Sequence, residues 1–437
     1  MKITKGNAVI VDFSVTNFRS IRDEHTFSMF AENPGKQLLD NISYPAGKKI
    51  GVLSCAGIYG ANASGKSNVL LAFEALQFLI RASGSLKDGN PISCYEPFRL
   101  SEETKTAPVR FEIEFFTPDG MRYVYKIAFT RKRIIEERLD FYPSAKIALV
   151  FERNSDDTWE TIKFGTLFSG GKKRFPFFAN NAYLSHAGNS ADAPELIRNV
   201  YNYFRNDILR LGLNEEVRID DWIDDESVFD KVAALLGFVD TGVSGVVVQE
   251  NDIDLSSVQL PDKMPGSMRA SILREMKRSF LFAHQTDTGE LEHFDLRLES
   301  SGTRKLFHLA PLIINVLDRG GVLIVDELDN SMHPFIAELI IRLFNDSEVN
   351  CGHAQLIFST HNISLMSPEH FRRDQIWLTE KVKGATRLFS LEDFDKNKVK
   401  PQSPFGRWYA EGRFGAVPKI DYQNIASLLK ESGGADA

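Results

Sequence analysis

Residues Gly57–Ala72 read GIYGANASGKSNVLLA, and this stretch decides the fold. Within it, residues 60–67 (GANASGKS) fit the pattern G-x-x-x-x-G-K-[ST] of a phosphate-binding loop. The apolar run over residues 51–59 predicts a buried strand before the loop, and the apolar spacing over residues 68–81 predicts a helix after it. Strand, loop and helix in this order are the context that the motif requires, so we expect a nucleotide site here.

The residue types of the loop suit phosphate groups. Gly60 and Gly65 let successive backbone N–H groups turn toward phosphate oxygens, and the helix that starts near Lys66 points its positive dipole end at the same place. Lys66 supplies a charge to the β- and γ-phosphates, and the Ser67 hydroxyl can ligate Mg²⁺. The residues expected to bind the nucleotide are Gly60, Asn62, Ala63, Ser64, Gly65, Lys66, Ser67 and Asn68.

The overall charge gives little reason to expect a protein that coats nucleic acid. The chain has 437 residues, enough for two or three domains, and a formal net charge of −7. A local basic groove remains possible, but a solvated loop or hairpin is the favoured interpretation of each basic cluster. These clusters are residues 131–133, residues 172–174, and Lys396, Lys398 and Lys400.

Cysteine usage and hydropathy favour a reducing compartment. The three cysteines show neither Cys-x-x-Cys spacing nor a paired framework. No signal peptide is visible, and the longest apolar stretch, residues 309–325, is broken by Asp318 and Arg319. We therefore expect a cytoplasmic protein without a membrane span.

The hydrophobic pattern, and with it the predicted secondary structure, changes along the chain. Residues 8–30 alternate as two strands, and residues 109–153 contain short period-2 segments typical of an antiparallel sheet. Helical patterns follow at 193–210 and 226–237, a strand at 243–248, and an exposed insertion is expected over 251–274. The expected fold class is α/β, in four parts: 1–97 with the phosphate loop, a β lobe at 98–163, a mainly helical insertion at 164–278, and a C-terminal part at 279–437 that completes the domain of the phosphate loop.

A second strand delivers two carboxylates. Residues 321–325 (GVLIV) predict a buried strand that ends in Asp326 and Glu327. Ligands of an open parallel sheet bind at the carboxyl ends of its strands. We expect Asp326 to hold Mg²⁺ through water and Glu327 to polarise the attacking water as general base. Taken alone, the pair reads as helix-capping or surface residues; the phosphate loop favours the functional interpretation.

His361 follows a third apolar strand, residues 355–358, where it could contact a γ-phosphate. His333-Pro334 marks either an ordinary helix start or a position near the site. Ser300, Ser301 and Gly302 open a helix, and hydroxyls with free N–H groups at such a start can hold an anion. By itself, Ser-Ser-Gly at a helix start is an ordinary helix cap. If the phosphate loop already holds the nucleotide of its own subunit, this helix start would contact a phosphate bound by another subunit.

These parts together resemble the ABC-type ATPases of the RecF/SMC kind, and more narrowly the bacterial AAA-family ATPases of anti-phage systems. That narrower group includes the abortive-infection ATPases, AbiL and RloA-like proteins. The segments that carry the resemblance are the phosphate loop, SSGTR (300–304), VLIVDELDNSMHP (322–334), IFSTHN (357–362), FSVTNFRSI (13–21) and YAEGRFGAVP (409–418).

The resemblance implies an ABC-type P-loop head that binds ATP and Mg²⁺ and forms a homodimer or higher homo-oligomer. It implies that Ser301 and Gly302 act in trans on ATP held by Lys66 and Ser67, and that His361 is a switch histidine. The signature is SSGTR rather than LSGGQ, and no glutamine-loop residue is assigned. Related OLD-family nucleases carry a Toprim domain after the ATPase, whereas here no acidic metal cluster is visible after the acidic pair, which implies a separately encoded effector such as a Toprim-like nuclease.

Three functions follow as hypotheses. The first is an ATP-hydrolysing switch of an anti-phage complex with a separate effector. The second is a RecF/SMC-like DNA-repair ATPase that clamps DNA, although the chain has no long heptad-repeat arm. The third is a nucleotide-binding scaffold without turnover.

Overall fold

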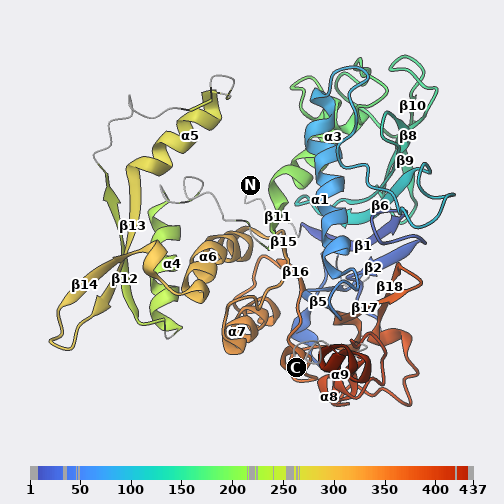
Figure 1. The fold of residues 1–437 in the computed structure, drawn as a ribbon. Coiled ribbons are helices and arrows are strands. Elements are labelled where there is room, and N and C mark those ends of the chain that lie inside the picture. The colour runs from blue at the N-terminus through green and yellow to red at the C-terminus, as the bar shows by residue number, and fades with distance from the viewer. Residues whose placement is uncertain are drawn as a thin grey trace.

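A computed structural model defines the fold (Figure 1). The structure describes residues 8–32, 37–45, 47, 50–213, 215, 222, 225–239, 241–251, 260, 261, 264, 266–418 and 421–431. Most of residues 251–265 of the predicted exposed insertion lies outside this range.

A six-stranded sheet carries the phosphate loop. Its order is β11-β15-β16-β5-β17-β18, and all neighbours are parallel except β17 and β18. The strands are β5 (Cys55–Gly60), β11 (Ile208–Leu211), β15 (Val322–Val325), β16 (Gln355–Ser359), β17 (Ile376–Val382) and β18 (Ala385–Ser390). Every residue of β5, β15 and β16 is buried, which explains their unbroken apolar runs. The predicted α/β class is confirmed.

The predicted single strand over residues 51–59 is wrong in one respect, because it is broken at Ser54. The chain forms β4 (Val52–Leu53), which pairs with β3 (Ile42–Ser43), and then β5. The Ser54 hydroxyl donates to the Asn41 carbonyl at 3.2 Å and lies 2.6 Å from Asn345 Oδ1. These bonds hold the chain at the point where it passes from one strand pairing to the next.

A seven-stranded antiparallel sheet forms the predicted β lobe. Its order is β10-β9-β8-β7-β6-β1-β2. The strands are β1 (Val9–Thr16), β2 (His25–Ser28), β6 (Val109–Phe116), β7 (Arg122–Phe129), β8 (Ile134–Phe141), β9 (Ala148–Asn154) and β10 (Lys163–Phe164). The two N-terminal strands, which the sequence grouped with the phosphate loop, thus belong to the same sheet as β6–β9.

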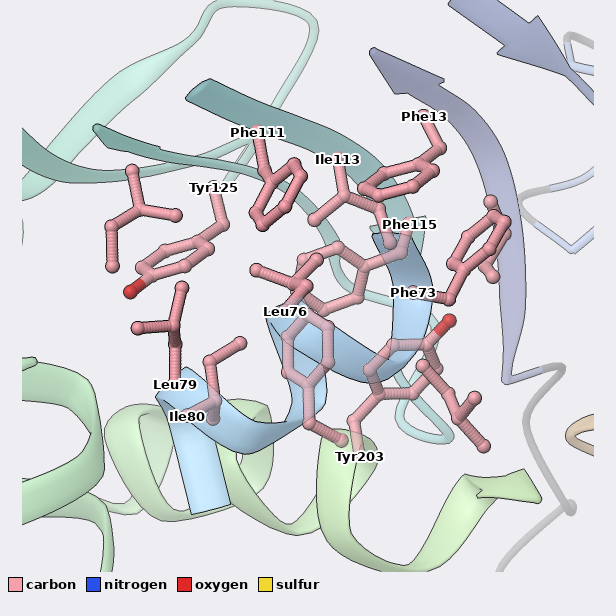
Figure 2. Close-up of a cluster of buried hydrophobic side chains, with 14 of the residues drawn as sticks. Phe13, Phe73, Leu76, Leu79, Ile80, Phe111, Ile113, Phe115, Tyr125 and Tyr203 are labelled. Atoms are coloured by element: carbon pink, nitrogen blue, oxygen red, sulfur yellow. The ribbon is translucent and has the colours of Figure 1, made fainter. Parts of the chain in front are cut away.

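Helix α1 (Lys66–Ala82) leaves the phosphate loop and packs against the antiparallel sheet. Phe73 stacks on Phe13 with ring centroids 4.0 Å apart, and Phe115 stacks on Tyr203 at 4.6 Å. Figure 2 shows these rings with Leu76, Leu79 and Ile80 in one buried cluster. The aromatic cluster therefore ties the helix that carries Lys66 to strands β1 and β6.

The connection back to the parallel sheet contains α2 (Tyr183–Gly188), α3 (Glu195–Asn202) and a π-helical turn (Tyr203–Asp207). The helix predicted over residues 193–210 is too long, since Ile208 already begins β11. The Gln77 amide donates to the Phe204 and Ile208 carbonyls at 3.0 and 2.9 Å. This contact from α1 ends the helical segment and directs the chain into the sheet.

A smaller lobe projects from the other side of the parallel sheet (Figure 1). It contains α4 (Glu226–Phe238), β12 (Val243–Glu250), α5 (Gly266–Lys277), β13 (Arg278–Gln285) and β14 (Leu291–Asp295). Strand β14 ends at Asp295, and residues 296–298 form a 3₁₀ turn. Residues 266–274 of the predicted exposed insertion lie in α5.

Four helices complete the described chain. They are α6 (Ser301–Arg319), α7 (Pro334–Asn345), α8 (Phe405–Ala410) and α9 (Tyr422–Glu431). Helix α6 packs on α4 of the small lobe and on β15, so it joins that lobe to the sheet. Over the described residues, every helix is too short or too polar to cross a lipid bilayer.

Candidate functional site

The phosphate-binding loop lies between β5 and α1 and turns in conformations that favour glycine. The φ angles are +154° at Gly60, +115° at Gly65 and +60° at Ala63. A Cβ atom at Gly65 would lie 2.1 Å from Thr386 Oγ1, and one at Gly60 would lie 2.5 Å from the Thr379 carbonyl oxygen. Strands β17 and β18 therefore press on the loop and leave no room for side chains there.

Several predicted loop residues use their side chains within the protein. The Ser64 and Thr379 hydroxyls lie 2.6 Å apart, and the Asn68 amide donates to the Ser20 hydroxyl at 2.6 Å. Asn62 and Ala63 are exposed. Ser64 and Asn68 thus brace the loop, and ligand contact from this part falls to backbone N–H groups and to Lys66.

Lys66 folds back over the loop. Its ammonium donates to the Gly60 and Ala61 carbonyls at 3.0 and 3.3 Å and lies 3.4 Å from His361 Nδ1. Burial lowers the pKa of Lys66 to about 8, while the carboxylates of Glu327 and Asp326 oppose that shift. A bound phosphate group would add negative charge and further acceptors beside this partly desolvated ammonium.

Asp326 joins the loop to the ends of two neighbouring strands. Its Oδ1 accepts hydrogen bonds from Ser67 Oγ at 3.2 Å and from Ser359 Oγ at 2.5 Å. Hydroxyl and carboxylate oxygens are ligands that Mg²⁺ prefers, so Ser67 and Asp326 fit the predicted metal ion. Ser359, the last residue of β16, is absent from the sequence-based list, because nothing in the pattern STHN distinguishes it from an ordinary strand end.

Glu327 lies in a left-handed backbone conformation, with φ of +51°, which is uncommon for a residue with a side chain. Its backbone N–H donates to Ser359 Oγ at 2.8 Å, and its carboxylate oxygen Oε1 lies 3.6 Å from His361 Nε2. Burial and the nearby Lys66 charge lower the pKa of His361. The structure therefore brings Lys66, Glu327 and His361 together.

The helix start that follows the small lobe is capped by Ser300. Its hydroxyl accepts from the Thr303 N–H at 3.1 Å, whereas the predicted contact residue Ser301 is exposed. A Cβ atom at Gly302 would lie 2.7 Å from the Ser331 carbonyl oxygen, in the loop that follows the acidic pair. Ser301 is therefore free to meet a ligand from outside, and Ser300 is a further hydroxyl at the same place.

The structure favours the structural interpretation of His333. Its Nδ1 accepts from the Phe335 N–H at 3.3 Å, and Pro334 begins α7. This is the arrangement of a helix N-cap followed by proline. Among the described residues, no group of three or more His, Cys, Asp or Glu side chains is arranged to hold a metal ion.

A parallel sheet that carries a glycine loop, a lysine, a serine and an acidic pair at one edge defines a P-loop nucleoside triphosphatase domain. Residues 55–367 match the AAA_21 family, described as "AAA domain, putative AbiEii toxin, Type IV TA system". The match spans well over half of the chain, and the protein belongs to this family.

Solved structures with similar folds come from SMC and RecF proteins. The SMC head domain from Thermotoga maritima has 15% sequence identity and a TM-score of 0.39, with 87% of this chain and 98% of that chain covered. An SMC head bound to the C-terminal winged-helix domain of ScpA has 13% identity and a TM-score of 0.46, with coverages of 87% and 97%. RecF with ATP has 10% identity and a TM-score of 0.38, with coverages of 89% and 100%. The search of curated proteins gave no match.

Proposed function

We propose that this protein is an ATP-hydrolysing molecular switch that pairs through its nucleotide sites and controls a separately encoded effector in anti-phage defence. The observation that carries the ATPase proposal is the convergence of three segments. Ser67 and Ser359 both donate to Asp326, and Glu327 lies beside His361, which in turn lies beside Lys66.

In the proposed reaction, Lys66 and the loop N–H groups bind the phosphates, and Ser67 and Asp326 hold Mg²⁺. The bound ion supplies positive charge to the phosphate oxygens. Glu327 orients the attacking water and accepts its proton, and His361 orients the Glu327 carboxylate. Because both acidic residues end one strand, a single short segment presents the metal ligand and the base.

The exposed Ser301 supports a paired arrangement. In our proposal, Ser301 and Gly302 of one subunit contact the triphosphate held by Lys66 of another. ATP favours pairing only if the paired state binds it more tightly than separate subunits do. Hydrolysis then weakens the pair and resets the effector.

The test of the ATPase proposal is phosphate release by the full chain with and without Glu327→Gln. We expect the variant to bind ATP and to hydrolyse it at least about 100-fold more slowly than the wild type, as for loss of a general base. The exposed Glu348 serves as control, and Glu348→Gln should keep the wild-type rate. Wild-type hydrolysis by Glu327→Gln would overturn the assignment of the base, and absence of turnover in the wild type would favour the non-hydrolysing scaffold.

The link to defence rests on the family description, which names a toxin and a type IV toxin–antitoxin system, and on the resemblance to abortive-infection ATPases. The test is co-purification of the chain with the product of the adjacent gene, followed by phage challenge of cells that carry both genes. Loss of protection in Lys66→Ala cells is the expected result. Protection that survives this substitution would separate defence from nucleotide binding.

A DNA clamp is the second candidate, because one groove is basic. A groove of about 770 Å³ beside the C-terminal end of α1 is lined by Arg81, Arg205 and Arg210, together with Glu74. Arg210 is paired with Glu74 and Glu215 at 3.3 and 2.7 Å, which leaves less charge for phosphates. Salt-sensitive DNA binding that is lost in Arg81→Ala plus Arg205→Ala would support this function.

A further inference from the structure

Lys305 is a buried cation that the proposed mechanism does not use. It lies on α6, four residues after Ser301, so the two side chains share one face of the helix. The Lys305 ammonium is buried, and the described part of the chain offers it no hydrogen-bond partner. Burial lowers the pKa of Lys305, while the carboxylates of Asp326 and Glu327 oppose that shift.

An ammonium buried without hydrogen bonds is unfavourable unless nearby negative charge compensates for it. Helix α6 packs on β15, the strand directly before Asp326 and Glu327, and the carboxylates of these two residues act on Lys305. Lys66 acts on the same two carboxylates from α1. The acidic pair therefore lies in the field of two lysines that come from different helices, one after the phosphate loop and one after the signature segment.

The two lysines differ in what a nucleotide would do to them. Lys66 lies at the phosphate-binding loop, where its ammonium would donate hydrogen bonds to the phosphate oxygens of a bound nucleotide. Lys305 lies on the 19-residue helix α6, directly after the first turn, which contains Ser301 and Gly302. Because a helix moves as a rigid unit over so few turns, a shift of its first turn would move the Lys305 ammonium relative to Glu327.

We propose that Lys305 is a positioning residue that balances the charge of Asp326 and Glu327 and couples the signature segment to the orientation of Glu327. The charge-balancing part stands on the structure alone, and the coupling part rests on the proposed function. In this proposal, Ser301 of one subunit contacts the nucleotide of the other subunit. That contact then changes the orientation of Glu327 in the subunit that carries this Ser301.

The first experiment measures binding of Mn²⁺ alone to the nucleotide-free full chain by electron paramagnetic resonance. Removing a nearby positive charge should make Lys305→Met bind Mn²⁺ at least about three-fold more tightly. Lys305→Arg should match the wild type. Lys231→Met is the control. Lys231 lies on α4, is half exposed, and pairs at 2.7 Å with Asp318, which lies on α6 as Lys305 does. Equal Mn²⁺ affinity in Lys305→Met and the wild type would overturn the proposal.

The second experiment measures ATP hydrolysis by the same variants. We expect Lys305→Met to lower kcat about ten-fold or more with KM changed less than about two-fold, because an orientation effect acts on the chemical step. Lys305→Arg should restore the rate. An unchanged kcat would overturn the coupling part. If the wild type does not hydrolyse ATP, the proposed function fails while the Mn²⁺ result still decides the role of Lys305; if Lys305→Met does not fold, Lys305→Gln replaces it in both measurements.

Discussion

At the scale of single residues, the phosphate-binding loop has no spare volume at Gly65. The φ angle of +115° already disfavours any side chain, and Thr386 Oγ1 occupies the space in which a Cβ atom would lie. Thr386 Oγ1 also donates to the Ser64 carbonyl at 2.8 Å, so the hydroxyl cannot move away without loss of a hydrogen bond. Strands β17 and β18 thus hold the loop in its observed conformation.

We expect Gly65→Ala to weaken ATP binding by at least about 100-fold, because the loop must open to admit the methyl group. Equilibrium binding of a fluorescent ATP analogue measures this. Gly89→Ala is the matched control: Gly89 also has a positive φ, of +74°, but open space around it. A loop that binds ATP normally after Gly65→Ala would contradict the phosphate-cradle interpretation.

At the scale of elements, the π-helical turn Tyr203–Asp207 and the start of β15 are packed together. A Cβ atom at Gly321 would lie 2.6 Å from the Asp207 carbonyl oxygen. Burial raises the pKa of the Asp207 carboxyl from 3.8 to about 6. The turn that leads into β11 therefore carries a carboxylate that is unfavourable near neutral pH.

The folded state binds the Asp207 proton more tightly than the unfolded state does. The free energy of unfolding should therefore fall as the pH rises from 3.8 to about 6, and should stay lower above that range. We expect Asp207→Asn to raise Tm by about 2 to 4 °C at neutral pH, with a smaller gain at about pH 5. Thermal denaturation at both pH values, with the exposed Asp88→Asn as control, measures this difference. A gain that is equal at both would rule out the carboxylate charge as its cause.

A short polar contact links the small lobe to the signature segment. His284 Nε2, on β13, lies 2.7 Å from Glu299 Oε1, and the Glu299 side chain is only 6% exposed. Glu299 directly precedes the helix cap Ser300. The lobe therefore has a direct contact with the start of α6.

Removal of this contact by His284→Ala should loosen the first turn of α6. We expect backbone amide hydrogen exchange over residues 301–304 to become about ten-fold faster, while exchange in β16 stays unchanged. His293→Ala, on the exposed strand β14, is the control. If exchange over residues 301–304 is equally fast in the two variants, the His284–Glu299 contact has no part in holding the first turn.

At the scale of the whole molecule, the proposed pairing of subunits predicts complementation between inactive variants. Lys66→Ala removes the phosphate lysine, and the double variant Ser300→Ala, Ser301→Ala removes the signature hydroxyls. A mixed pair contains one intact composite site, so an equal mixture should regain up to about a quarter of wild-type hydrolysis if subunits pair at random. Phosphate release from the mixture, compared with each variant alone, measures this. Activity that is merely the average of the two variants would argue against sites shared between subunits.

The sequence by itself determined the local features of this protein. The spacing of Gly60, Gly65, Lys66 and Ser67, the apolar strand before Asp326 and Glu327, and the helix after the signature segment are all set by residues close together in the chain. Motif, hydrophobic period and capping act over a few residues, so they can be recognised without the fold.

The tertiary structure alone decided which of these features meet. Only strand pairing puts Ser359 against Asp326, carries β1 into the antiparallel sheet, and breaks the strand at Ser54. Only packing buries Lys305 and leaves Ser301 exposed. These relations depend on contacts between residues tens to hundreds of positions apart, and such contacts leave no periodic trace in the sequence.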